Sequence, residues 1–297
     1  MRLLIIGREG QLARALATRR PDAMILSRPR IDLADPASLA APIRASRPDA
    51  IVNAAAYTAV DRAEQELALA DAVNGIAPGV IAAVAAELDV PFVHVSTDYV
   101  FAGDAARPYS EDDPIAPQSA YGRSKAAGEA AVRASGADHA IVRTAWVYAG
   151  EGANFLRTML RLARDHDEVR VVADQHGAPT LAADLADGIL AMLARWPTGG
   201  VRKTYHLTNS GSTTWAGFAE AIFAEAAARG LPSVRVEPIT TADYPTTARR
   251  PAMSVLDGTR LAHDFGITLR PWNEALSALF ADRDFHAAMS RSLSPGA

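Results

Sequence analysis

A tyrosine and a lysine stand four residues apart in the segment Tyr121-Gly122-Arg123-Ser124-Lys125. In a helix, this spacing places both side chains on one face. An ammonium beside a phenol lowers the pKa of the phenol from about 10 toward working pH. We therefore predict that Tyr121 donates a proton and that Lys125 tunes it; the alternative is a surface tyrosine on a solvated helix. The lysine needs explaining because the chain has only two, Lys125 and Lys203, against 28 arginines.

Hydroxyl groups follow the apolar run PFVHV, in the segment Ser96-Thr97-Asp98. In an open parallel sheet, ligands collect beyond the carboxyl ends of the strands. We therefore predict that Thr97 hydrogen-bonds the reacting oxygen of a substrate. The alternative is a strand-terminal threonine that satisfies a backbone group.

Glycines mark the first turn of the chain, in the segment GREGQLA over residues 7–13. Glycine at a strand-to-helix turn lets the backbone approach a pyrophosphate, which sits on the helix N-terminus. The spacing G-x-x-G-x-x-A departs from G-x-G-x-x-G, although Ala13 is small enough for close helix packing. A dinucleotide site is predicted here, with an ordinary tight turn as the alternative. Its residues are Gly7, Gly10, Gln11 and Leu12.

The second apolar run ends near Leu26, where an enzyme that prefers NAD usually carries an acid for the ribose 2′-hydroxyl. This chain has Ser27 and Arg28 instead. An arginine beside a small hydroxyl suits a 2′-phosphate, which it binds through charge-assisted hydrogen bonds. We predict NADPH as the cofactor, with NADH possible. The alternative is that Arg28 is a solvated loop residue.

Short apolar runs alternate with Ala-rich stretches through the first half of the chain. Strands are expected in RLLIIG, AMIL, AIVNAAA, PFVHVS and HAIVRT, and helices over 11–20, 36–46, 62–88 and 119–135. This alternation predicts an α/β fold, a Rossmann-like doubly wound parallel sheet covered on both faces.

The pattern loosens after Thr144. Helices are expected over 153–166, 180–195, 214–229 and 272–282, with short strands near 169–173 and 204–207. We predict an NAD(P)-binding domain over 1–150 and a smaller, mainly substrate-binding lobe over 151–297. Within the lobe, about 174–196 is expected to pack back on the first domain.

Composition limits the partners. A formal net charge of −4 and a pI near 6.0, without a clustered basic face, exclude a nucleic-acid partner. The chain has no cysteine, and no apolar segment approaches the roughly 20 residues that span a bilayer. We therefore expect a cytoplasmic protein with no membrane partner. The seven histidines lack ligand spacing, so none is predicted to bind a metal.

Longer blocks carry a finer signal. They are Gly10-Gln11-Leu12, VNAAAYTAVDRAE, STDYVFAG, YGRSKAAGE, RTAWVYA, DQHGAPT, YHLTNSG and RRPAMSVLD, in this order along nearly the whole chain. Together they resemble the dTDP-4-dehydrorhamnose reductases, extended short-chain dehydrogenases/reductases. The resemblance implies NADPH or NADH and a dTDP-linked 4-keto-6-deoxy sugar. The implied reaction reduces dTDP-4-dehydro-L-rhamnose to dTDP-L-rhamnose, for cell-surface polysaccharides such as lipopolysaccharide.

The resemblance also implies roles for individual residues. It makes Tyr121 the proton donor, Lys125 the cation that binds ribose and tunes the phenol, and Thr97 the third catalytic member. Further implied cofactor contacts are Asp32, Leu33, Ala56, Tyr57 and Thr58, although the family commonly has His in place of Tyr57. Implied contacts of the sugar nucleotide are Thr97, Asp98 and Trp146.

The substrate's diphosphate needs positive partners from the second lobe. Arg249 and Arg250 are the candidates, because arginine can bond phosphate through two N–H groups at once. The alternative is that both are solvated.

Some relatives bind Mg²⁺ through glutamates at a dimer interface, and two matching positions here are Ala15 and Ala183. A site without carboxylates cannot hold a hard cation tightly. We predict no bridging metal, and a monomer or weak homodimer. Two rival functions stay open: another nucleotide-sugar 4-ketoreductase or epimerase, and a non-catalytic NADP-binding regulatory subunit like that of methionine adenosyltransferase.

Overall fold

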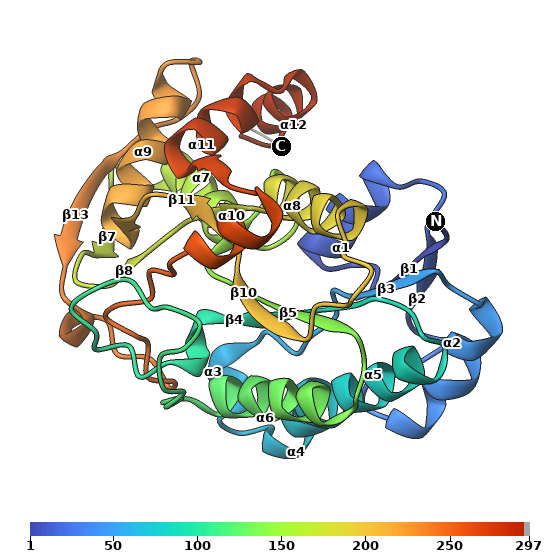
Figure 1. Cartoon of the computed structure of the whole chain (residues 1–297). Coiled ribbons are helices and arrows are strands. Elements are labelled where there is room, and N and C mark those ends of the chain that lie inside the picture. The colour runs from blue at the N-terminus through green and yellow to red at the C-terminus, as the bar shows by residue number, and fades with distance from the viewer. Residues whose placement is uncertain (294–297) are drawn as a thin grey trace.

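The computed structural model of the chain describes residues 1–293, with side chains through Met289 (Figure 1). Its centre is a six-stranded sheet in the order β10-β5-β4-β3-β1-β2, with every neighbouring pair parallel. The predicted doubly wound α/β fold is confirmed. The strands are β1 (Leu3–Ile6), β2 (Met24–Leu26), β3 (Ala50–Asn53), β4 (Phe92–Thr97), β5 (His139–Thr144) and β10 (Lys203–His206).

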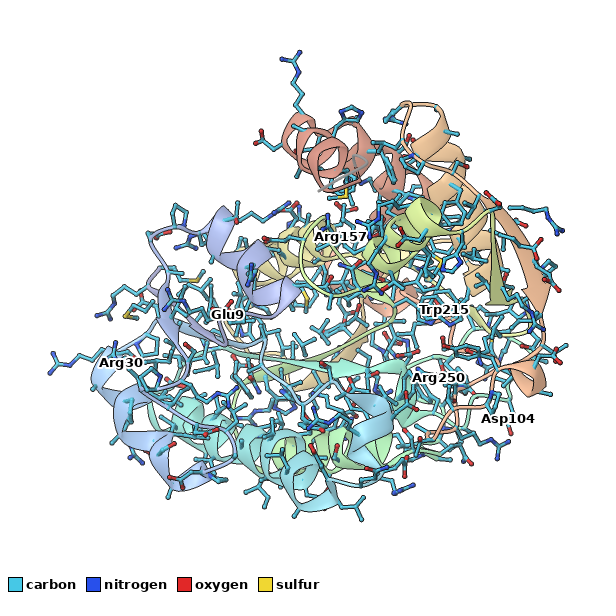
Figure 2. The ribbon with its side chains drawn as sticks, turned by 180° about the vertical axis from the view of Figure 1, so that it is seen from behind. Glu9, Arg30, Asp104, Arg157, Trp215 and Arg250 are labelled. Carbon is cyan, nitrogen blue, oxygen red and sulfur yellow. The ribbon has the colours of Figure 1, made fainter. Side chains whose placement is uncertain are left out.

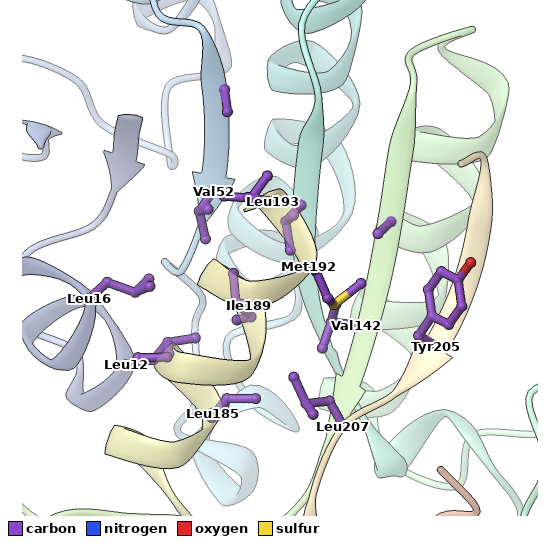
Figure 3. Packing of buried hydrophobic residues seen from close by; sticks show 14 of the residues in the cluster. Leu12, Leu16, Val52, Val142, Leu185, Ile189, Met192, Leu193, Tyr205 and Leu207 are labelled. Carbon is purple, nitrogen blue, oxygen red and sulfur yellow. The ribbon is translucent and has the colours of Figure 1, made fainter. Parts of the chain in front are cut away.

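Helices cover both faces of this sheet because its strands are apolar on both sides. Leu3 and Ile5 face one core, whereas Leu4 and Ile6 face the other. Figure 3 shows the first core, where Leu12 and Ile189 pack from two helices toward the strands. Its helices are α1 (Gln11–Arg19), α8 (Ala182–Ala194) and α10 (Thr259–Phe265). On the other face lie α2 (Ala40–Ser46), α5 (Ala77–Glu87) and α6 (Ala120–Ala134).

A second lobe has its own apolar core. The lobe comprises α7 (Phe155–Asp165), α9 (Trp215–Ala227), α11 (Trp272–Ala281), α12 (Arg283–Leu293), β7 (Glu168–Val172) and β13 (Arg235–Ile239). The sequence analysis did not predict β13, which contains Pro238. It pairs only with β7, so it is an edge strand, where proline is tolerated.

Short elements connect these layers. The paired strands are β6 (Val147–Tyr148) with β9 (Thr180–Leu181), β8 (His176–Gly177) with β12 (Thr213–Thr214), and β11 (Asn209–Ser210) with β14 (Leu269–Pro271). The remaining helical segments are α3 (Val60–Ala63), α4 (Leu67–Ala70), a π-helical turn over Asp71–Ile76, and 3₁₀ turns over Pro36–Ser38, Asp98–Val100 and Thr241–Asp243.

The chain returns to the sheet after residue 150. Helix α8 packs against α1, and β10 extends the sheet beside β5. The sequence suggested that the strand near 204–207 belongs to the smaller lobe; in the structure, Tyr205 is buried in the first core instead. The division of function at residue 150 therefore stays a prediction.

One helical run, within the helix expected over 62–88, is more apolar than the sequence analysis expected. Residues Leu67–Glu87 form 21 continuous helical residues that could cross a membrane by length and composition alone. The expectation that no apolar segment approaches this length is wrong, because this run carries only two charged residues, Asp71 and Glu87. In the structure, α5 packs against α2 and α6, and 44 % of the apolar window is buried.

Gly128 sets the distance between α6 and the π-helical turn. A Cβ atom at Gly128 would lie 2.0 Å from the backbone oxygen of Asn74. Gly128→Ala should therefore lower the unfolding free energy by about 1–3 kcal/mol, because backbone must shift. Thermal unfolding midpoints measure the loss. Gly199→Ala is the matched control, since nothing lies within 4 Å of a Cβ there. Equal midpoints for the two variants would contradict this packing.

Candidate active site

Tyr121 lies in the first turn of α6, beside the carboxyl end of β4. Ser119 caps this helix, because its Oγ accepts a hydrogen bond from the Gly122 amide at 3.1 Å. A Cβ at Gly122 would lie 2.2 Å from the Tyr99 carbonyl oxygen, so the glycine permits the close approach. The Tyr121 ring is buried and meets the Tyr99 ring edge-on, with centroids 5.5 Å apart.

Lys125 reaches the backbone of β4. Its Nζ donates a hydrogen bond to the Val95 carbonyl at 2.7 Å and lies 3.4 Å from His94 Nε2. The side chain is 1 % exposed, and this burial lowers the pKa of Lys125 to about 8.

The phenol does not behave as its spacing to the lysine predicted. Burial raises the pKa of Tyr121, and a hydrogen bond with Thr97 opposes that shift only in part. Lys125 does not contribute to the shift in the pKa of Tyr121. The largest cause of that shift is the loss of water around the buried phenol. Tyr121 therefore keeps its proton at neutral pH, as a proton donor requires.

Thr97 ends β4 and joins a buried carboxyl group. Its Oγ1 donates to Asp98 Oδ1 at 2.9 Å and accepts from the Tyr99 amide at 3.2 Å. Burial raises the pKa of Asp98 to about 6, although hydrogen bonds from Thr97 and Ser254 oppose the shift. Within residues 1–289, Asp98 Oδ2 has no hydrogen-bond partner. This oxygen is buried beside the Thr97 hydroxyl.

The glycine turn lies where the strand order reverses, between β1 and β3. Ligands bind at such switch points in α/β sheets. Gly7 has a φ of +110°, and a Cβ there would lie 3.2 Å from Ala55 Cβ, so the position requires glycine. Gly10 is the N-cap of α1, while the Leu12 side chain is buried in the first core.

Gln11 joins this turn to the second lobe. Its Nε2 donates to the Val147 carbonyl at 3.2 Å, and its Oε1 accepts from Asn154 Nδ2 at 3.0 Å. Asn154 also caps α7 through a hydrogen bond from the Arg157 amide. A polar bridge thus spans the two lobes beside the predicted dinucleotide site.

The residues predicted to choose the cofactor follow β2. Ser27 is half-buried and Arg28 is exposed, and within residues 1–289 no ion pair engages the Arg28 guanidinium. Asp32 accepts a hydrogen bond from the Ala34 amide at 3.0 Å, and Leu33 packs beside the second face of the sheet. The Arg28 side chain is therefore accessible to a phosphate.

The loop over residues 54–59 follows β3 and contains Ala56, Tyr57 and Thr58. Asn74 holds it, because Asn74 Oδ1 accepts from the Tyr57 amide at 2.8 Å and Nδ2 donates to the Tyr57 carbonyl at 3.0 Å. Asn74 also donates to Ser124 Oγ at 3.1 Å, which ties the loop to α6. The Tyr57 hydroxyl donates to Glu66.

The two predicted diphosphate ligands differ in their surroundings. Arg250 Nη2 bonds Asp61 Oδ2 at 2.7 Å, and its Nη1 donates to the Tyr99 hydroxyl at 3.3 Å. Arg249 is exposed, and its Nη1 lies 3.5 Å from Gln118 Oε1. Arg249 is therefore the less engaged guanidinium of the two.

Trp146 belongs to an aromatic stack at the entrance to the second lobe. Its ring stacks on Trp215 with centroids 3.6 Å apart, and a Cβ at Gly177 would lie 2.3 Å from the Trp146 ring. Figure 2 shows Trp215 and Arg250 toward one end of the molecule, with Arg30 projecting at the opposite end.

Sequence reasoning missed four residues around this site: Asp61, Asn74, Glu129 and Trp215. Glu129 carried a signal, because it follows Lys125 by a further four residues on the same helix face. The other three meet the predicted residues only through tertiary contacts.

Comparison with known proteins places the chain in a family. The family model described as the RmlD substrate binding domain matches residues 1–284. A dTDP-4-dehydrorhamnose reductase of Burkholderia thailandensis is 46 % identical over 295 residues, covering 95 % of this chain and 99 % of the relative. The chain belongs to the dTDP-4-dehydrorhamnose reductase family.

The chain is also similar to two further proteins. A dTDP-4-dehydrorhamnose reductase from Bacillus anthracis, solved in complex with NADP, superposes with a TM-score of 0.88 at 35 % identity, covering 94 % of this chain and 98 % of that one. A probable dTDP-4,6-dihydroxy-2-methyloxan-3-one 4-ketoreductase of Streptomyces antibioticus is 42 % identical and covers 95 % of each chain.

The two lysines make the electrostatics of this site directly measurable. Selective ¹³C labelling of lysine gives two NMR signals, and Lys203→Arg assigns them. The Lys125 signal should titrate with a midpoint of about 8, because burial disfavours its ammonium. A midpoint at the ordinary lysine value of 10.5 would contradict the buried position.

Proposed function

We propose that this chain reduces the 4-keto group of dTDP-4-dehydro-L-rhamnose to give dTDP-L-rhamnose, with NADPH as the preferred reductant. The observation that carries the proposal is the buried phenol of Tyr121 beside Thr97, with Lys125 one turn further along α6. Membership in the dTDP-4-dehydrorhamnose reductase family supplies the substrate class. The product would serve cell-surface polysaccharide synthesis, including that of lipopolysaccharide.

The mechanism follows from what each side chain can do. When bound, a reduced nicotinamide would supply the hydride that the ketone carbon requires. Tyr121 donates its proton to the ketone oxygen as negative charge develops there, and burial keeps that proton in place at neutral pH. The Thr97 hydroxyl hydrogen-bonds the same oxygen, since it lies beside the phenol at the end of β4. Lys125 binds the cofactor ribose and stabilises the phenolate left behind.

The chain offers a suitable cradle for a nicotinamide dinucleotide. Gly7 and Gly10 stand at the switch point of the sheet, and Gln11 borders them. Asp32, Leu33 and the 56–58 loop contribute the remaining proposed contacts. The preference for NADPH rests on Ser27 and Arg28, and the family member solved with NADP is consistent with it.

The sugar nucleotide is proposed to lie between β4 and the second lobe. Asp98 offers a free carboxyl oxygen, Trp146 an aromatic face, and Arg249 an exposed guanidinium for the diphosphate. Arg250 approaches the site through Tyr99, so we assign it the end of the diphosphate nearer the sugar.

Other predictions accompany this function. We propose that residues 1–150 bind the cofactor and that 151–297 bind mainly the sugar nucleotide, and we infer a cytoplasmic monomer or weak homodimer without a bridging metal. Within the described residues, no group of three His, Asp or Glu side chains is arranged to hold a metal ion.

A related 4-ketoreductase is the second candidate, because the Streptomyces antibioticus relative carries a different substrate name at similar identity. Product stereochemistry, determined by NMR of the reduced sugar, distinguishes the two. An epimerase would change stereochemistry without net consumption of NADPH. A regulatory subunit would bind NADP without turnover, although this chain retains both Tyr121 and Lys125.

Tyr121→Phe tests the proposed function. With dTDP-4-dehydro-L-rhamnose and NADPH, we expect turnover to fall by at least about 10²-fold, because the proton donor is gone. NADPH affinity, measured by fluorescence titration, should change little since the ring remains. Tyr244→Phe is the control, because that tyrosine is exposed. Near wild-type turnover by Tyr121→Phe would refute the assignment.

Arg28→Ala tests the choice of cofactor. Loss of a charge-assisted hydrogen bond of about 1.5–3 kcal/mol should weaken NADPH roughly ten- to hundredfold and leave NADH nearly unchanged. The ratio of the two Michaelis constants is the measurement. Arg161→Ala, an exposed arginine on α7, is the control, and the Arg8/Arg28 double variant tests whether both share the phosphate. Equal shifts for both cofactors would remove the basis for an NADPH preference.

A further inference from the structure

A buried carboxylate lies one helical turn beyond Lys125. Glu129 is fully buried in α6, and its Oε1 accepts hydrogen bonds from Ser96 Oγ at 2.7 Å and from Arg143 Nε at 2.8 Å. Ser96 immediately precedes Thr97 on β4, and Arg143 is its partner in register on β5. Glu129 therefore joins the helix that carries Tyr121 to the strand that carries Thr97.

Both oxygens of this carboxylate are satisfied. Arg143 Nη2 donates to Oε2 at 2.7 Å, and Arg133 Nη2 donates to the same oxygen at 2.8 Å. The Arg143 guanidinium is 1 % exposed and lies over the Phe101 ring at 4.9 Å. Burial is the largest single influence and favours a higher pKa for Glu129, but the hydrogen bonds from Arg143 and Ser96 and the charges of Arg143 and Arg133 together outweigh it and leave that pKa lowered. The carboxylate is thus charged at neutral pH.

Contacts from α6 reach β4 at successive residues. Lys125 bonds the carbonyl of Val95, and Glu129 bonds the hydroxyl of Ser96. We propose that Glu129, Ser96 and Arg143, here termed the Glu129 network, are positioning residues that set the catalytic face of α6 against Thr97 and supply negative charge beneath Lys125. This proposal rests on the function proposed above.

The charged and titratable groups around Lys125 give the proposal a specific readout. His94 faces it from β4, Tyr121 and Glu129 share its helix face, and Arg143 approaches from β5. Burial lowers the pKa of His94 well below its usual range, so this imidazole is neutral. Burial also lowers the pKa of Lys125, whereas the charge of Glu129 raises it. If Glu129 and Arg143 formed a purely structural ion pair, replacing Glu129 would leave the midpoint of the Lys125 titration unchanged.

Glu129→Gln is the first test variant. It keeps the shape of the side chain but removes its charge, so the ammonium of Lys125 should lose its proton at lower pH. We expect the Lys125 NMR midpoint to fall by about one pH unit. The Glu129→Gln/Arg143→Met double variant removes both buried charges and should show a smaller fall, because the loss of the Arg143 cation opposes the loss of the Glu129 anion. An unchanged midpoint in folded Glu129→Gln, or a larger fall in the double variant, would overturn the electrostatic part of the proposal.

Ser96→Ala tests the positioning part without leaving a buried charge unpaired. We expect kcat to fall about three- to tenfold while the KM for NADPH stays unchanged, because the helix is less firmly set against Thr97. An unchanged kcat would overturn this part. If neither Glu129 variant folds, Ser96→Ala alone decides between positioning and mere stability.

The matched control is Asp184→Asn. Asp184 is also a buried carboxylate with an arginine partner, Arg270, but it lies on α8, across the sheet from α6. Asp184→Asn should lower the stability of the protein. It should leave the Lys125 midpoint, kcat and the KM for NADPH unchanged. A midpoint that moves in this control would show that the readout reports general loosening, which contradicts the proposal. Wild-type protein without reductase activity would instead refute the proposed function, since the NMR midpoints do not depend on turnover.

Discussion

The contact of α6 with β4 is the interaction on which the rest of the candidate site depends. Gly122 lets the helix approach the Tyr99 carbonyl in the turn that follows β4, because a Cβ there would lie 2.2 Å from that oxygen. Lys125 then bonds the backbone of β4 directly. Since Thr97 ends that same strand, the approach brings a phenol, a hydroxyl and an ammonium to one edge of the sheet. A loose helix would separate these groups even if every one of them were present.

Burial controls the chemistry of these groups more than their mutual charges do. It raises the pKa of Tyr121, raises that of Asp98 to about 6 and lowers that of Lys125 to about 8. A protonated phenol suits reduction, in which the substrate oxygen takes up a proton. The spacing of Tyr121 and Lys125 predicted a lowered pKa for Tyr121, which is the wrong direction. That spacing reflects the nearby cation but not the loss of water around the buried phenol.

The second lobe is tied to this edge by polar bridges. Gln11 contacts Val147 and Asn154, while Arg250 contacts Asp61 and Tyr99. Gly103 also lies against Pro251, where a Cβ would come within 2.4 Å. These contacts bring segments almost 190 residues apart in the chain to one site, so a sugar nucleotide and a dinucleotide can meet at the end of β4.

The sequence by itself determined the first five strands of the sheet, most helices, and the candidate residues for the chemistry, because these depend on local patterns. Alternating apolar runs indicate buried parallel strands, and Tyr121, Lys125 and the glycine turn are recognisable from spacing alone. Only the tertiary structure decided that β10 joins the main sheet, that Arg250 pairs with Asp61, and that Trp146 stacks on Trp215. It also decided the direction of the Tyr121 pKa. Pairing across distant segments and loss of water both depend on how the whole chain packs, and no local spacing encodes either.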